Sequence, residues 1–276
     1  MLQRFERPKV LSEALALMSG NARPICGGTD IMIQMGLGIR VPELLVDLKL
    51  VEGLDELGWE GDVLNIGASV TIERICRYPG LKEDFFALYE GCRDIGSAQI
   101  RERASIAGNI AHASPCADSV PGLIVSGASV LLAKEGGERV VELEKFFLGP
   151  GKTVMQAGEI IVKVMIPRPS KDFRSSFAKI KRVKGHDLAL VNVALSVEGQ
   201  RLRCAIGSCA PTVVTIDLPT FTPSDQGLQN LLALVDARIS PIDDVRASKA
   251  YRREMAAVLT KRLWHEVLST KEESNA

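Results

Sequence analysis

The order of apolar and polar residues in the first half of the chain changes repeatedly between strand and helix patterns. Short apolar runs that end at turn residues predict extended segments at 23–26, 44–48 and 63–67. Apolar residues spaced three or four apart predict helices, which we place at 12–21, 29–35, 71–77, 84–94 and 117–127. The first half of the chain is therefore a mixture of helices and strands.

From residue 128 onward, strands come first and helices follow. Strands are predicted at 128–133, 139–141 and 159–167, and the turn E-G-G-E at 135–138 joins the first two. Strand-like segments at 175–183, 189–197 and 201–209 follow one another closely, which predicts a three-stranded antiparallel sheet. Helices are expected at 226–236 and from 246 onward. This order of elements indicates the α+β class.

The long C-terminal helix is predicted to pack one face onto the antiparallel sheet. Its apolar residues recur at three-to-four spacing, at Tyr251, Met255, Val258, Leu259, Leu263, Val267 and Leu268. The basic residues Arg252, Arg253, Lys261 and Arg262 fall on other faces of the helix. We therefore expect the apolar set to be buried and the basic set to face solvent.

A chain of 276 residues is long enough to form about two domains. The segment P-R-P-S-K-D at 167–172 is the best linker candidate, because two prolines and a polar run interrupt regular structure. We therefore expect one domain at 1–168, with subdomains of about 1–55 and 56–168, and a second at 173–276. The polar tail K-E-E-S-N-A at 271–276 is the one segment expected to lack order.

Composition and charge exclude several classes of partner. Lysine plus arginine and aspartate plus glutamate each total 34, so no global positive field attracts nucleic acid or anionic lipid. No apolar run is long enough to span a membrane, and the N-terminal residues lack the apolar core of a secretory leader. A cytoplasmic protein that binds no nucleic acid is expected.

The six cysteines do not form the pattern of a metal site. They stand at positions 26, 76, 92, 116, 204 and 209, and only the last two are close in sequence. Zinc sites and iron–sulfur clusters need several thiolates at short, paired spacings. Reduced and mostly buried thiols are therefore expected, with no metal bound by this chain.

Two glycine turns carry the candidate chemistry. I-C-G-G-T-D at 25–30 lies between a predicted strand and a predicted helix, and S-I-A-G-N-I-A occurs at 105–111. Glycine lets the backbone approach a ligand, and consecutive N–H groups at such a turn can bind phosphate oxygens. Two such turns could hold one diphosphate, and Asp118 could accept hydrogen bonds from a ribose or an adenine amino group. Alternatively, each is only a turn between packed elements.

Known dinucleotide motifs do not explain these turns, because neither G-x-G-x-x-G nor a Walker lysine occurs at them. The segment A-Q-I-R-E-R-A-S-I-A-G-N-I-A-H-A-S-P-C-A-D-S-V-P at 98–121 instead resembles the signature of the FAD-binding subunit of molybdenum hydroxylases. I-C-G-G-T-D resembles the first flavin loop of the same family, which includes bacterial xanthine dehydrogenases and carbon monoxide dehydrogenases. Further resemblance covers nearly the whole chain, at 149–152, 159–167, 177–182 and 246–253.

The resemblance implies a fold and a cofactor site. The fold would be a two-subdomain FAD-binding domain of the vanillyl-alcohol-oxidase/PCMH type, followed by a C-terminal domain with an antiparallel sheet and helices. The FAD diphosphate would lie against the main chain of Ile25, Cys26, Gly27, Gly28, Thr29, Asp30 and Ile31 and of Ser105, Ala107, Gly108 and Asn109. Asp118 would hold the ribose or adenine end, and Ile161 and Lys179 would contact the flavin. Ile95 stands where some relatives place an aromatic ring against the isoalloxazine.

No catalytic residue is assigned, since a flavin itself carries redox chemistry. His112, His186 and His265 are far apart in sequence, and no G-x-S-x-G motif occurs. His112 is expected to be structural or solvent-facing. With no acid–base pair evident, FAD is the expected reactive group.

The resemblance also implies partner subunits. A small iron–sulfur subunit would deliver electrons from a large molybdenum-pterin subunit to FAD, and NAD or another acceptor would take them onward. The expected assembly is a dimer of heterotrimers of the xanthine dehydrogenase type. Two alternatives are a free-standing FAD-dependent oxidoreductase of the same fold, such as a relative of the cell-wall enolpyruvyl reductases, and a nonenzymatic nucleotide-binding scaffold protein.

Overall fold

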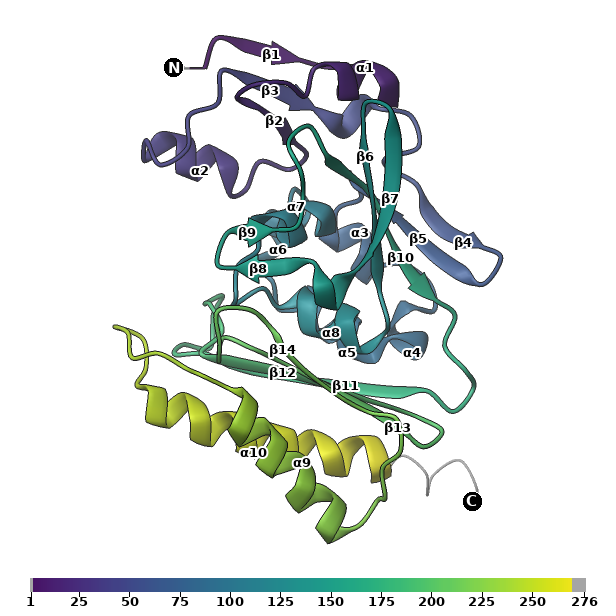
Figure 1. The fold of residues 1–276 in the computed structure, drawn as a ribbon, viewed down its shortest axis with the longest axis vertical. Helices are drawn as coiled ribbons and strands as arrows, with labels where there is room; N and C mark the ends of the chain where they lie inside the picture. Colours follow the sequence, from purple (N-terminus) through teal and green to yellow (C-terminus); the bar gives the residue numbers. More distant parts are fainter. Residues whose placement is uncertain (1, 270–276) are drawn as a thin grey trace. The chain divides into compact units, whose positions relative to one another are not determined.

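A computed structural model describes residues 2–269 of the chain (Figure 1). The predicted polar tail at 271–276 lies outside the described residues. The described chain forms two compact units that interleave along the sequence. Unit 1 comprises residues 2–75, 97–113 and 128–168, and unit 2 comprises residues 76–96, 114–127 and 169–269. Because these units are defined by packing, the linear boundary at 168–173 stays a prediction.

The N-terminal part of unit 1 is a small parallel sheet with two short helices. Its strands lie in the order β1 (Arg4–Glu6), β3 (Leu44–Asp47) and β2 (Ala22–Ile25), and the helices are α1 (Leu11–Ala16) and α2 (Ile31–Gly36). Val46 of β3 packs with Ala14 of α1 and with Leu48 of the 3-10 turn Leu48–Leu50. This arrangement places the end of β2 directly before the first glycine turn.

The second part of unit 1 is a five-stranded antiparallel sheet. Its strands lie in the order β4 (Leu57–Glu60), β5 (Val63–Gly67), β10 (Ile160–Pro167), β6 (Ser129–Lys134) and β7 (Gly137–Glu142). The central strand β10 has a register shift between Ile161 and Lys163. Around the sheet are α3 (Ile72–Cys76), α6 (Ala98–Arg101), α7 (Ile106–His112), the 3-10 turn Leu143–Lys145 and the short hairpin of β8 (Phe147–Gly149) and β9 (Lys152–Thr153).

Unit 2 is a four-stranded antiparallel sheet covered on both faces by helices (Figure 1). Its strands are β11 (Arg174–Ile180), β12 (Val191–Glu198), β13 (Arg201–Gly207) and β14 (Val214–Leu218). α9 (Asp225–Arg238) and α10 (Lys249–Ser269) cover one face, and α5 (Phe86–Arg93), preceded by α4 (Leu81–Asp84), and α8 (Ser119–Val125) cover the other. Double coverage explains why β12 is buried from Val191 to Val197 on both of its faces.

The mixed composition of the fold and the antiparallel C-terminal sheet confirm the predicted α+β class. The sheet of unit 2 has one more strand than the three predicted, because β14 was not recognised. Strand β4 was missed as well. Both are short edge strands. Their sequences, L-G-W-E and V-T-I-D-L, do alternate, so the signal for these strands was present and was overlooked.

The predicted packing of the last helix onto the sheet is confirmed, but its predicted buried face is partly wrong. Tyr251 and Val258 are exposed, whereas Arg252 is only 1% exposed. The buried face runs through Arg252, Ala256, Leu259, Thr260, Leu263, Trp264 and Val267. Arg252 can be buried because its guanidinium is paired with a carboxylate and two carbonyl groups.

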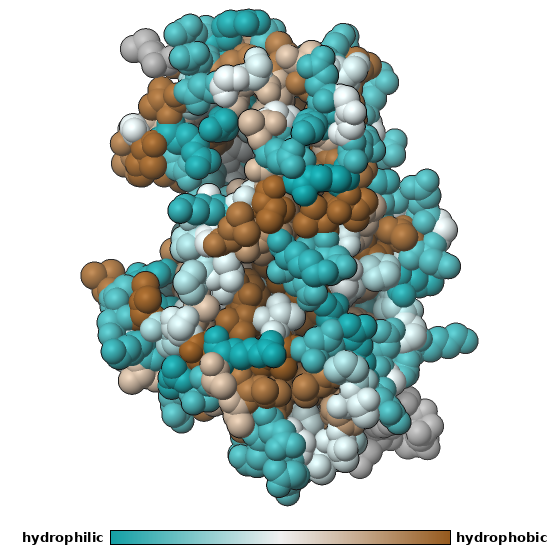
Figure 2. Space-filling model, in the orientation of Figure 1, coloured by the Kyte–Doolittle hydropathy of each residue, from teal (hydrophilic) through white to brown (hydrophobic). Residues whose placement is uncertain are grey.

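Unit 1 also exposes apolar side chains on and after α2. Met32, Ile33, Leu37 and Ile39 are all more than half exposed. Figure 2 shows brown surface over α2, at the upper left of the view. No residue of α2 is fully buried, so this helix is held by partly buried contacts.

Candidate functional site

The first glycine turn presents a run of free main-chain donors. β2 ends at Ile25, Gly28 adopts a positive φ of 75°, and α2 begins at Ile31, two residues after the predicted start at 29. Asp30 is at the N-cap position, but its side chain makes no capping hydrogen bond. In the described part of the chain, the N–H groups of residues 27–31 donate to no protein acceptor. This turn can therefore donate several hydrogen bonds to a ligand.

The second glycine turn is the capped start of α7. Ser105 is the N-cap residue, and its Oγ accepts from the N–H of Gly108 at 3.1 Å. The Ser105 carbonyl accepts from the N–H of Asn109 at 3.0 Å. Ser105 and Ala107 are buried, whereas Gly108 is exposed. The Ser105 hydroxyl thus holds the helix start, and Gly108 forms the accessible surface of this turn.

The structure brings the two glycine turns together within unit 1. A Cβ atom at Gly27 would lie 1.8 Å from the carbonyl oxygen of Arg103, so only glycine allows this approach. Burial raises the pKa of the Cys26 thiol, while hydrogen bonds with Ser69 and Ser105 oppose that rise. The sulfur of Cys26 accepts from Ser69 Oγ at 3.8 Å. Cys26 therefore helps to connect the first turn to the second.

His112, at the end of α7, connects α7 to α2. Its Nδ1 lies 3.4 Å from Nε2 of Gln34, and its Nε2 lies 3.8 Å from Oδ1 of Asp30. The side chain is about one-third exposed, at 32%. These contacts hold the helices that follow the two turns next to each other.

Asp118 and Lys179, predicted as separate ligands, form an ion pair in unit 2. Nζ of Lys179 lies 2.6 Å from Oδ2 of Asp118, and the two side chains are only 3% and 9% exposed. The amide nitrogen of Asn192 donates to the other Asp118 oxygen at 2.9 Å. Burial raises the pKa of Asp118 to about 6, and the charge of Lys179 and the hydrogen bonds from Lys179 and Asn192 limit the rise.

Sequence reasoning missed three residues of this polar group: Asn192, Asp94 and Lys181. Asp94 lies just after α5 and contacts both Lys179 and Lys181. Lys179 lies on β11 and Lys181 follows its last residue, so the two lysines are two positions apart in sequence, and both contact the same aspartate. That spacing was the available signal. The acidic partner could not be found from it, because it is far away in sequence.

The remaining predicted site residues lie in different units. Ile161 belongs to unit 1, at the register shift of β10, and is 5% exposed. Ile95 belongs to unit 2 and is half-buried after α5, where its N–H donates to the Cys92 carbonyl at 3.2 Å. Both glycine turns are thus in unit 1, and Ile95, Asp118 and Lys179 are in unit 2.

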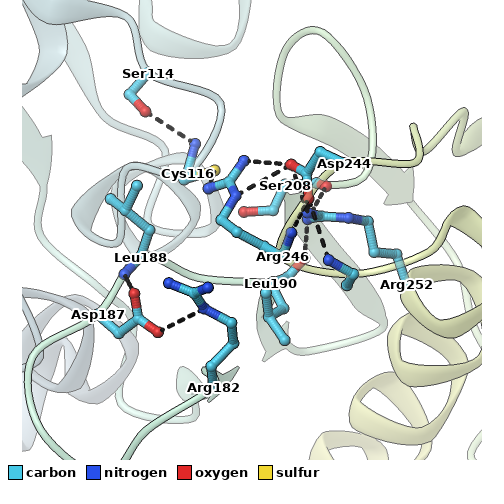
Figure 3. Close-up of polar contacts among 11 residues, drawn as sticks. Ser114, Cys116, Arg182, Asp187, Leu188, Leu190, Ser208, Asp244, Arg246 and Arg252 are labelled. Atoms are coloured by element: carbon cyan, nitrogen blue, oxygen red, sulfur yellow. Dashed lines mark hydrogen bonds and ion pairs between the residues drawn. The ribbon is translucent and has the colours of Figure 1, made fainter.

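A second polar cluster of unit 2, in which Arg252 is buried and Asp244 and Arg246 are half-buried, was also missed (Figure 3). Asp244 accepts from Nη2 of Arg246 at 2.7 Å and from Nη2 of Arg252 at 2.9 and 3.0 Å. Burial alone would raise the pKa of Asp244, but hydrogen bonds from Arg246, Ala247 and Arg252 hold it well below its usual range. Nη1 of Arg246 lies 3.7 Å from the sulfur of Cys116. The cluster therefore links the start of α10 to the S-P-C-A-D segment.

Two absences hold for the described residues. Residues 2–269 contain no group of three or more histidine, cysteine, aspartate or glutamate side chains arranged to hold a metal ion. In that same range, no helix is long and apolar enough to cross a membrane.

Comparison with known proteins identifies the family. Residues 2–169 match the FAD binding domain in molybdopterin dehydrogenase, and residues 175–267 match the CO dehydrogenase flavoprotein C-terminal domain. The fold and the matched domains therefore define an FAD-binding domain followed by an antiparallel C-terminal domain. The chain belongs to the family of FAD-binding medium subunits of molybdenum hydroxylases. The family resemblance and the fold type inferred from the sequence are confirmed.

Relatives resemble the chain over most of its length. The glyceraldehyde dehydrogenase medium chain of Sulfolobus acidocaldarius is 27% identical over 275 residues, which cover 95% of this chain and 97% of the relative. The nicotinate dehydrogenase FAD-subunit of Eubacterium barkeri is 30% identical over 201 residues, or 70% and 68% of the two chains. A chain of carbon monoxide dehydrogenase from Hydrogenophaga pseudoflava superposes with a TM-score of 0.90 at 26% identity, covering 98% of each chain.

Proposed function

We propose that the chain binds FAD and is the electron-transfer subunit of a multisubunit molybdenum hydroxylase. In this proposal it takes electrons from a small iron–sulfur subunit, itself supplied by a large molybdenum-pterin subunit, and passes them to NAD or another acceptor. Family membership supports the cofactor, and the words "medium chain" and "FAD-subunit" in the names of its relatives support the multisubunit assembly. A dimer of heterotrimers in the cytoplasm is the form we expect.

The observation that carries the proposal is the row of free N–H groups at residues 27–31. Main-chain donors that are withdrawn from bulk water need an acceptor, and diphosphate oxygens are strong acceptors. Gly27 and Gly28 are half-buried, and the second turn lies beside them with Gly108 exposed. The chemistry of these donors therefore fits the diphosphate of FAD.

In the proposed site, this chain binds and orients the cofactor. FAD, when bound, supplies the redox chemistry. The N–H groups of residues 27–31 would hold the diphosphate, together with the main chain of Ser105–Asn109. Asp118 would accept from the ribose or adenine end, and Ile95, Ile161 and Lys179 would contact the flavin. No residue of this chain is assigned as a catalytic acid or base.

We further propose that the large partner subunit determines the substrate specificity of the complex. The xanthine dehydrogenase type expected from the sequence is represented among the relatives, as in the FAD-binding subunit from Escherichia coli O157:H7. Relatives that act with glyceraldehyde and nicotinate, by their names, are similar at comparable identity, over 275 and 201 residues. A flavin subunit common to all of these enzymes is consistent with a substrate pocket on another chain.

Gly108→Val is the direct test of the glycine turns. Gly108 is exposed, and an added Cβ would meet only Ser105 Oγ, at 3.1 Å, so a larger side chain would fill the accessible surface of the turn. We expect the purified variant to lose its visible flavin absorbance. Gly36→Val is the matched control, because Gly36 is also helical and exposed and has no atom within 4 Å of its added Cβ. Full flavin content in Gly108→Val would refute this placement of the diphosphate.

Two further measurements separate the alternatives. A wild-type protein that is colourless and takes up no added FAD would leave only the nonenzymatic scaffold. A flavoprotein that brings no iron–sulfur and molybdenum subunits from its native host would instead favour a free-standing oxidoreductase. Under our proposal, the yellow protein copurifies with both partner subunits.

A further inference from the structure

The carboxylate of Asp118 is held from several sides within unit 2. Lys179 Nζ donates to Oδ2 at 2.6 Å, and Asn192 Nδ2 donates to Oδ1 at 2.9 Å. Behind it, the Asp118 carbonyl lies 2.4 Å from the position that a Cβ of Gly91 would take, so α5 packs directly on this backbone. Although Asp118 is at the N-cap position of α8, its side chain does not cap the helix. The carboxylate is therefore oriented by tertiary contacts.

The ammonium group of Lys179 makes two hydrogen bonds and one further ion-pair contact within the protein. An ammonium has three hydrogens. The Nζ atom has three oxygen neighbours: Asp118 Oδ2 at 2.6 Å, the Asp94 carbonyl at 3.3 Å and Asp94 Oδ2 at 3.3 Å. With its side chain 3% exposed, Lys179 has little access to water. Lys179 is thus set to orient Asp118, and Asp94 in turn orients Lys179.

Asp94 extends this pair toward the surface. Its Oδ1 lies 2.5 Å from Nζ of Lys181, and the Asp94 and Lys181 side chains are 33% and 22% exposed. Charges therefore alternate from Asp118 through Lys179 and Asp94 to Lys181. The outer pair is partly exposed to water, whereas the inner pair, with side chains 3% and 9% exposed, is largely shielded from it.

Asn192 is an unusual residue for its position. It is 0% exposed in the middle of β12, and its Oδ1 has no hydrogen-bond partner among the described residues. A Cβ at Gly207 of the neighbouring strand would lie 2.1 Å from that oxygen, so glycine is needed beside it. A buried amide with an unpartnered oxygen lowers stability. The amide nitrogen also donates to the Ala117 carbonyl, at 3.4 Å, but its shorter bond is the one to Asp118, which gives the residue a role at that carboxylate.

We propose that Asn192 and Asp94 are positioning residues of the flavin site, which together set the orientation and the ionisation of Asp118 and thereby make FAD retention depend on pH. This inference rests on the proposed function, in which Asp118 binds FAD. Neither residue touches the cofactor in this scheme. Each acts through hydrogen bonds or charge on Asp118, directly for Asn192 and mainly through Lys179 for Asp94.

The two positioning residues act on Asp118 in opposite directions. Burial raises the pKa of Asp118 to about 6, Lys179 and Asn192 lower it, and the negative charge of Asp94 raises it. The charged groups facing Asp118 are Lys179 from β11 and Asp94 from the end of α5, while β12 contributes the neutral Asn192. Loss of the Asn192 donor should therefore raise the pKa of Asp118, and loss of the Asp94 charge should lower it.

The test is the affinity of the purified full-length protein for FAD as a function of pH. Flavin is removed, and FAD is titrated back from about pH 5 to about pH 8 while flavin fluorescence is followed. If ionised Asp118 binds FAD, wild-type affinity falls about tenfold per pH unit below a midpoint near 6. We expect the midpoint to move to higher pH in Asn192→Leu and to lower pH in Asp94→Asn.

Matched control variants distinguish the loss of a positioning residue from general destabilisation of the protein. Asn65→Leu removes another amide whose oxygen is buried without a partner, in unit 1. Asp217→Asn removes a carboxylate of unit 2 that is 32% exposed, as Asp94 is 33% exposed, and that is paired with Arg201. Both controls should keep the wild-type midpoint. If Asn192→Leu fails to fold, the pH midpoint of FAD affinity in Asp94→Asn, a substitution at a partly exposed position, still tests the inference.

The possible outcomes distinguish the inference from the proposed function. Opposite shifts of the midpoint in the two variants support the inference. An affinity that does not depend on pH, or unchanged midpoints in both variants, overturns it and leaves FAD binding intact. A wild-type protein that binds no FAD at any pH overturns the proposed function itself.

Discussion

Replacing Arg252 by methionine should destabilise unit 2 far more than a typical surface substitution. Arg252 lies on the buried face of α10 and is 1% exposed. Its Nη2 pairs with both oxygens of Asp244, and its Nη1 donates to the carbonyls of Leu190 at 2.6 Å and Ser208 at 3.3 Å (Figure 3). Methionine keeps much of the apolar stem and removes all of these donors.

The size of the effect follows from what the substitution leaves behind. Removing one partner of a buried ion pair costs about 3–5 kcal/mol, and the 20% exposure of the Asp244 side chain places the expected loss toward the lower end of that range. Asp244 would keep Arg246, but the carbonyls of Leu190 and Ser208 would lose a donor. Arg252 Nε has no partner even now, so nothing is lost at that atom. A loss of about 3–5 kcal/mol lowers the melting temperature by about 6–20 °C at this size.

Urea unfolding followed by circular dichroism measures the free energy of unfolding, and calorimetry measures the melting temperature. Arg253→Met is the matched control, because Arg253 is the next residue of α10, has a side chain 44% exposed and pairs with Asp236. We expect that control to change the free energy of unfolding by less than about 1 kcal/mol. Equal losses in the two variants would falsify the assignment of Arg252 as a buried structural ion pair.

Two further predictions concern the candidate site. Gly28→Ala and Gly53→Ala place alanine at nearly equal positive φ angles, 75° and 79°, so each should lose about 1–2 kcal/mol of stability from backbone strain. The loss should be larger for Gly28→Ala, because its added Cβ would lie 3.1 Å from Ile25 Cδ1, whereas that of Gly53 meets no atom within 4 Å. Only Gly28→Ala should also lower flavin content, measured by absorbance. The folded pKa of Asp118, about 6, lies above its ordinary value of 3.8, so its stabilising contribution is complete below about pH 4 and is lost as pH rises through 6. Asp118→Asn should therefore gain about 3 kcal/mol of stability relative to wild type between about pH 4 and pH 7. Urea unfolding at several pH values measures this difference. If the difference in unfolding free energy between variant and wild type does not change with pH, the raised pKa of Asp118 is contradicted.

Local patterns were sufficient where an element's own residues decide its conformation. The strand at 63–67 was placed at the residues of β5, and the helix expected at 226–236 lies inside α9. Alternation along a strand and three-to-four spacing along a helix depend only on neighbours in sequence. The same local signal was present in β14, whose residues V-T-I-D-L alternate strictly, although this short edge strand was not assigned.

Arg252 shows why burial could not be assigned from the pattern alone. A charged residue is placed on the solvent face by default, because an isolated buried charge is very costly. Here Asp244 and two carbonyl groups remove that cost, and one of those carbonyls belongs to Leu190, 62 positions away in sequence. Only the folded chain brings these groups together.

At the candidate site, too, some features could be recognised from the sequence and others only from the tertiary structure. The glycine turns, their chemistry and the family resemblance could be recognised from the residues, because a phosphate-binding turn is a contiguous segment of backbone. The pairing of Asp118 with Lys179, and the part taken by Asn192 and Asp94, appeared only in the fold. Their side chains come from α8, β11, β12 and the end of α5, and the direction of a side chain across such distances is set by packing. Sequence identified the donors for FAD, whereas tertiary structure determined which charges orient one another.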